Sequence, residues 1–82
     1  MAAKRMLRSG VVDGTWFYTI EAALLDARRW EAWFACGRLS KTTGVGAVSE
    51  ALEVRESVEE LQAWADALTD GQVRALVQKY CA

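Results

Sequence analysis

The sequence predicts a mainly α fold: a compact bundle of three to four short helices, with a possible N-terminal β-hairpin or extended arm. Three observations support this prediction. Apolar residues recur at helical spacing between Ile20 and Cys36, capping boxes begin at Ser57 and Thr69, and the 82 residues include no proline. We therefore expect short turns between closely packed helices.

The length of 82 residues is typical of a single domain. We divide it into a basic N-terminal arm, residues 1–14, and a helical body, residues 15–82. Two alternatives stay open for residues 6–19, a hairpin or an extended arm. The segment Thr15–Ile20 contains only good strand formers, and Asp13-Gly14 before it favours a two-residue hairpin turn. The helical stripe can also be extended back toward Asp13, so we expect helix from about residue 20 in either case.

The longest expected helix runs from Ile20 to Cys36. Its apolar positions 20, 23, 24, 27, 30 and 34 fall on one stripe, and Gly37 is a natural stop. A loop over residues 40–46 follows, because it is rich in Ser, Thr and Gly. Beyond the loop we expect a short helix with three apolar residues turned inward, Val48, Ala51 and Leu52, and a polar connection over residues 53–56.

Two further helices have clear start signals. Ser57 precedes Glu60 by three residues, and Thr69 precedes Gln72 by three, which is the capping-box spacing. Apolar residues then repeat at helical intervals after each cap: Val58, Leu61, Ala65 and Leu68, then Val73, Leu76, Val77 and Tyr80. Almost no linker separates the two segments, so we expect a sharp bend between them.

The chain has two cysteines, Cys36 and Cys81, and no histidine. A disulfide between them is one interpretation, but we favour two reduced, buried thiols because nothing else in the sequence indicates secretion. The ligands of a zinc site are missing, so we expect neither a metal nor a cofactor. We find no convincing targeting signal and no apolar run long enough for a membrane span, and we expect a cytoplasmic protein.

Charge is divided between the two halves of the chain. Residues 1–41 carry seven bases and four acids, whereas residues 42–82 carry three bases and seven acids. Such halves attract each other, either within one chain or between two antiparallel copies.

Catalytic machinery is hard to assemble from this composition. Histidine, the commonest general base, is absent, and Cys36 follows an aromatic segment that would raise the pKa of its thiol. The glutamates fall where solvated helix faces and helix N-termini are expected. We therefore do not expect an enzyme.

Aromatic residues suggest a binding function. Eight aromatic side chains are difficult to hide inside one chain of this size. Trp and Arg dominate interface hot spots, and both occur within one short stretch. We therefore predict a partner-binding site at Arg28, Arg29, Trp30, Trp33 and Phe34. The corresponding function is a small regulator, inhibitor or assembly factor, of the kind found among phage accessory proteins, which forms a homodimer and binds a larger protein.

The alternative function is nucleic-acid binding through the basic arm, at Lys4, Arg5 and Arg8. Residues 39–52 superficially resemble a helix-turn-helix, but the turn glycine is misplaced, and the candidate reading helix carries glutamates that repel phosphate. We favour the protein-interaction function over this alternative.

Overall fold

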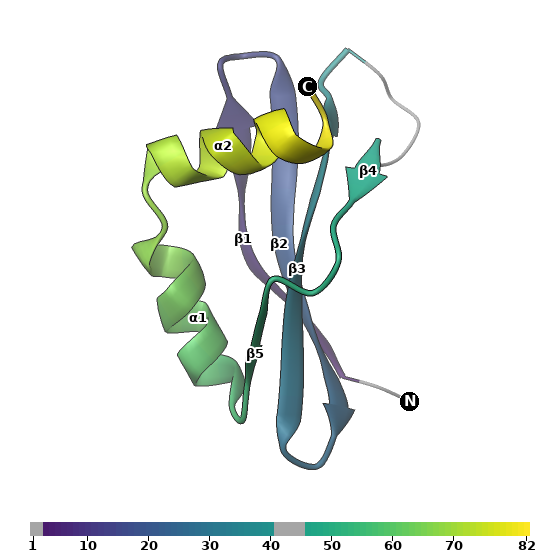
Figure 1. The fold of residues 1–82 in the computed structure, drawn as a ribbon, viewed down its shortest axis with the longest axis vertical. Coiled ribbons are helices and arrows are strands. Elements are labelled where there is room, and N and C mark those ends of the chain that lie inside the picture. The colour runs from purple at the N-terminus through teal and green to yellow at the C-terminus, as the bar shows by residue number, and fades with distance from the viewer. Residues whose placement is uncertain (1–2, 41–45) are drawn as a thin grey trace.

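The computed structural model describes residues 3–40 and 46–82, and in them the chain is mostly antiparallel sheet (Figure 1). Five strands are followed by two helices: β1 (Lys4–Val12), β2 (Trp16–Asp26), β3 (Arg29–Arg38), β4 (Ala47–Val48), β5 (Glu53–Arg55), α1 (Val58–Ala67) and α2 (Asp70–Tyr80). The three long strands pair in the order β1-β2-β3, and β4 and β5 both pair with β3. The predicted mainly α bundle is therefore wrong.

The largest error is the expected helix from Ile20 to Cys36, which is the end of β2, a tight turn and β3. The same residues satisfy a period of two: Tyr18, Ile20 and Ala22 are buried on β2, and Ala32, Phe34 and Cys36 are buried on β3. The turn between the strands has its own signal, because the carboxylate of Asp26 accepts a hydrogen bond of 3.1 Å from the backbone N–H of Arg28.

The hairpin alternative at the N-terminus is confirmed, and its strands are longer than expected. Asp13 and Gly14 both have positive φ, 54° and 66°, but Val12 pairs with Trp16, so the loop has three residues, Asp13–Thr15, rather than the predicted two. The N–H of Thr15 donates to the carbonyl of Val12 at 3.1 Å and closes this turn. The expected basic arm is consequently part of a paired strand, β1, which lies against β2 along its length.

The short helix expected around Val48 is also wrong. Backbone pairing with β3 replaces it, because this segment forms β4, an extended link and β5. Ser49 exchanges two hydrogen bonds with Phe34: its N–H donates to the Phe34 carbonyl at 2.7 Å, and its Oγ accepts from the Phe34 N–H at 2.8 Å. Of the expected loop, residues 41–45 lie outside the described residues.

Both capped helices are confirmed. Thr69 and Gln72 form a complete capping box at the start of α2. At α1 the side chain of Ser57 accepts from the N–H of Glu60, but the Glu60 carboxylate accepts from the serine hydroxyl rather than from the backbone. Among the described residues, neither helix is long and apolar enough to cross a membrane.

The core lies between the helices and one face of the sheet. Figure 1 shows α2 crossing in front of β1 and β2, with α1 beside the sheet. Apolar residues of both helices pack there against the buried residues of β2 and β3: Val58, Leu61, Ala65, Val73 and Val77. Burying the valine and leucine side chains among them contributes roughly 1.5–3 kcal/mol each.

A disulfide joins Cys36 of β3 to Cys81 at the end of α2, with the two Cα atoms 6.3 Å apart. The preferred interpretation of two reduced thiols is therefore wrong. In this 82-residue chain the bond fastens the last helix to the sheet and adds stability that a thin core does not supply.

Arg8 ties the two layers together. From β1 its guanidinium donates to the carbonyls of Ala65 and Leu68 at 2.9 and 2.7 Å, at the C-terminal end of α1, where the last turn has no basic residue of its own. Two described ion pairs join the halves of the chain. Arg8 lies 3.8 Å from Asp70, as the charge division predicts, whereas Arg74 pairs with Asp13 at 3.1 Å in the opposite sense, so these pairs do not bear out a general attraction between the halves.

Candidate interaction surface

The strands leave one face of the sheet uncovered by the helices, and large apolar side chains gather on it. Its four most exposed large apolar residues are Met6, Val11, Val48 and Val54, with exposed fractions of 56, 56, 60 and 43 %. Together with Phe17 and Trp33 they define what we call the open face. Among the described residues the other exposed large apolar side chains are Leu25 and Leu39, which lie near the ends of strands.

Strand pairing places these residues on the same side. Phe17 pairs with Val11 on one neighbouring strand and with Gly37 on the other. Ala35, two residues before Gly37, pairs with Val48 of β4. Paired residues project to the same face, and so do residues two apart on one strand. One end of the open face is therefore a continuous apolar surface.

Phe17 makes this end of the open face flat. A Cβ atom built on Gly37 would lie only 2.8 Å from two atoms of the Phe17 ring, so the ring occupies the space that a side chain at position 37 would need. The glycine thus lets an aromatic ring cover the neighbouring strand.

Charged residues of both signs lie at the other end. Lys4 forms an ion pair of 3.4 Å with Glu21, and its ammonium group lies 5.7 Å from the centre of the Trp33 ring. Strand alternation adds Arg29 and Glu31 to this face, because both have the parity of Trp33 on β3. Asp26 is the strand partner of Arg29 and forms an ion pair with it at 3.7 Å, so the charges described on the open face are two bases and three acids.

The structure divides the predicted partner-binding residues among three environments. Phe34 is fully buried and stacks on Tyr18, with ring centroids 5.6 Å apart. Trp30 packs against the core on the helix side, whereas Trp33 lies on the open face. Arg28 is exposed at the β2–β3 turn, and Arg29 follows it as the first residue of β3. A helix would have grouped the aromatic rings on successive turns; a strand sends neighbours to opposite faces.

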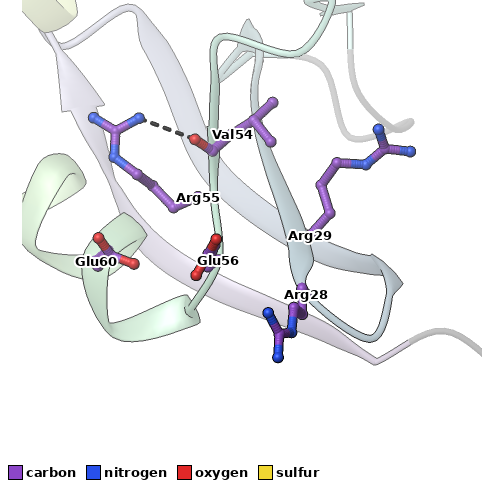
Figure 2. Close-up of a pocket in the computed structure, with 6 residues that line it drawn as sticks. All are labelled: Arg28, Arg29, Val54, Arg55, Glu56 and Glu60. Atoms are coloured by element: carbon purple, nitrogen blue, oxygen red, sulfur yellow. Dashed lines mark hydrogen bonds between the residues drawn. The ribbon is translucent and has the colours of Figure 1, made fainter.

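Arg28 and Arg29 line a shallow pocket of about 350 Å³, together with Val54, Arg55, Glu56 and Glu60 (Figure 2). Three arginines suggest an anion site, but Figure 2 shows Arg29 and Arg55 pointing to opposite sides of β5. Arg55 is already engaged with the carboxylate of Glu53 at 2.6 Å and with the Val54 carbonyl at 3.0 Å. The guanidinium groups do not converge on one position, so the pocket has no built anion cradle.

The three residues of the alternative nucleic-acid site, Lys4, Arg5 and Arg8, all lie on β1, but they have different roles. Lys4 and Arg5 are exposed, and Lys4 is paired on the open face. Arg8 is half-buried and donates to Tyr18 Oη at 3.0 Å as well as to the two α1 carbonyls. The Arg8 guanidinium therefore holds β1 against α1 through these hydrogen bonds and is not free to bind a nucleic acid.

Between the helices and the link to β5 lies a second, smaller apolar surface. It is a groove of about 330 Å³ whose largest lining residues are Leu52, Trp64, Leu68 and Leu76, with Lys79 at its border. Nearby, the hydroxyl of Tyr80 donates to the carboxylate of Glu50 at 2.7 Å. This hydrogen bond lowers the pKa of Glu50 and raises the pKa of Tyr80. The pair is a surface link between α2 and the β4–β5 segment.

Sequence reasoning missed most of the open face because it assigned the wrong period. The usable signal was the hairpin turn at Asp13-Gly14, but its two-residue register would pair Val11 with Trp16, whereas the structure pairs Val11 with Phe17. Val48 and Val54 had no comparable signal, since their strands have only two and three residues. Comparison with known proteins finds no matching family model, curated protein or solved structure, so the site is interpreted from its own geometry.

Proposed function

We propose that this chain is a non-enzymatic protein-interaction module whose open face is an interface with another polypeptide. The observation that carries the proposal is the exposure of Met6, Val11, Val48 and Val54 on a single sheet face. Contiguous apolar patches larger than a few hundred Å² are uncommon on monomeric soluble proteins and mark interaction sites. The opposite face of the same sheet is buried under two helices, so the apolar side chains of the sheet are covered on one face only.

The apolar character of the open face fits a polypeptide better than a nucleic acid. Its basic residues are matched by acids, with Lys4 already paired to Glu21, whereas nucleic-acid binding needs an excess of unpaired cations. Two occupants agree with the sequence-based expectations, a larger protein and a second copy of this chain. With either occupant, the module would act by covering part of the bound protein's surface or by bridging two proteins, without a chemical reaction.

Site-specific photo-crosslinking tests the proposal. A photoreactive amino acid replaces Val48 on the open face in cells that make the protein, and a matched variant carries it at Gln78, an exposed position of α2. We expect a protein adduct from position 48 and none of comparable yield from position 78. Equal labelling from both positions, or no adduct from position 48, contradicts the proposal. The mass of the adduct distinguishes a larger protein from a second copy.

The compartment is also part of the proposal. We expected a cytoplasmic protein from the sequence, but the Cys36–Cys81 bond favours an oxidising compartment, because disulfides are rare where thiols are kept reduced. Thiol trapping in intact cells, followed by fractionation, decides between them. Blocked thiols in the cytoplasmic fraction support the cytoplasm, and unreactive cysteines in an extracytoplasmic fraction support the oxidising compartment.

A further inference from the structure

We infer that the occupant of the open face is a second copy of this chain, in a symmetric dimer held together by the two sheets; the inference rests on the proposed function. In such a dimer the two open faces pack against each other, and α1 and α2 of each copy form the outer layers. Two sheets that pack face to face lie about 10 Å apart with their strands nearly aligned, so a flat apolar sheet is a natural partner for another.

The first argument is the balance of charge. The open face carries two bases, Lys4 and Arg29, and three acids, Glu21, Asp26 and Glu31. Lys4 is paired with Glu21 and Arg29 with Asp26 within the same copy, which leaves one acid, Glu31, in excess. In a two-fold symmetric interface the surface must be complementary to itself and a large excess of one sign would repel, so this near-balance is compatible with self-association. A foreign partner would not require this balance, because its own charges could compensate for any excess.

The second argument is shape. The Phe17 ring covers Gly37, and Ala35, Val11 and Val48 lie next to it in the paired strands. Ala35 is only 2 % exposed, so among the described residues the space between Phe17 and Val48 is filled and does not form a groove for an inserted helix or peptide. Alternating large and small side chains on a flat sheet instead suit interdigitation with a second sheet.

The third argument is area. Three strands of about ten residues, at roughly 3.3 Å per residue and about 4.8 Å spacing, give about 480 Å², and the short β4 and β5 extend the face to at most about 600 Å². This size fits within the longer extents of the molecule, 38 × 27 Å. Burying the face on two copies removes at most about 1,200 Å² from water, the lower end of standard-size interfaces. We therefore expect a reversible dimer, whose affinity is set by the fit of the two faces rather than by the area.

Light scattering after size-exclusion chromatography, over a wide range of concentrations, tests the inference. The unmodified chain should have the mass of a dimer at high concentration. Val48→Lys should raise the dimer dissociation constant at least tenfold, because an unpaired ammonium group would be buried at the interface. Gln78→Lys adds the same charge on α2 and should leave the dissociation constant unchanged. Far-UV circular dichroism establishes that each variant is folded, and Val11→Lys replaces Val48→Lys if the latter unfolds.

Each outcome decides between the two proposals. A dimer that dissociates in the Val48 or Val11 variant, but not in the Gln78 variant, supports the inference. A dimer that persists in the open-face variants overturns it and moves the interface elsewhere. A monomer at all concentrations also overturns it; the proposed function then survives only if position 48 still cross-links to a different protein, and fails if it cross-links to nothing.

Discussion

Replacing Arg8 by methionine is expected to lower the free energy of unfolding by about 2–4 kcal/mol. Methionine keeps much of the apolar volume and removes the guanidinium that joins β1 to the end of α1. That group donates three hydrogen bonds, to the carbonyls of Ala65 and Leu68 and to the hydroxyl of Tyr18, at 2.9, 2.7 and 3.0 Å.

The magnitude follows from these three bonds. A hydrogen bond to neutral partners contributes about 1 kcal/mol net, and one that involves a charged group contributes roughly 1.5–3 kcal/mol. The lower value is appropriate because the Arg8 side chain is 23 % exposed and water partly replaces the lost bonds. The ion pair with Asp70 adds almost nothing, since its atoms are 3.8 Å apart and the Asp70 side chain is 99 % exposed.

Urea denaturation followed by far-UV circular dichroism measures the change. The comparison requires that the unfolding free energy depends on urea concentration with the same slope in each variant. Arg5→Met is the matched control, because Arg5 lies on the same strand but is exposed, and its loss should change the free energy of unfolding by less than about 0.5 kcal/mol. Arg8→Lys should fall between the two, since one ammonium group replaces only part of the hydrogen bonding. If Arg8→Met is no more destabilising than Arg5→Met, the guanidinium does not hold the layers together.

Three further predictions concern the disulfide, the surface link and the first turn. Replacing Cys36 and Cys81 by serine opens a loop with a sequence separation of 45 and should lower the free energy of unfolding by about 4 kcal/mol relative to the oxidised, unmodified protein, with reductant-treated protein as the control that should match the variant; an unchanged melting temperature would contradict it. Tyr80→Phe should raise the pKa of Glu50 toward its ordinary value of 4.5, followed by carboxyl NMR, because the phenol hydrogen bond lowers it. The stability that this bond contributes is present above pH 4.5 and is lost as the pH falls through the lowered pKa of Glu50. The Tyr80→Phe variant should therefore lose less stability over that pH range, and a Glu50 pKa that is the same in both proteins would exclude the bond in solution. Gly14→Ala should cost about 1 kcal/mol in urea denaturation, because φ is 66° there, and an Asn variant should cost less; equal losses would argue against backbone strain.

Local signals in the sequence determined the elements whose hydrogen bonds close within a few residues. The capping pairs at Ser57 and Thr69 and the turn at Asp13-Gly14 all appear in the structure, because each is formed by neighbours in the chain. The residue types needed for these features are specific, and distant contacts do not alter them.

Tertiary structure alone decided the rest. Between Ile20 and Cys36 the apolar residues satisfy both a helical and a two-residue period, and pairing of β3 with β2, β4 and β5 selects the strand. That choice buried Phe34, turned Trp33 to the open face and brought Cys36 to Cys81, so the candidate site and the disulfide both depend on it. The physical reason is that strand pairing joins residues as distant in the chain as Trp16 and Arg38, whereas each capping bond joins residues three positions apart.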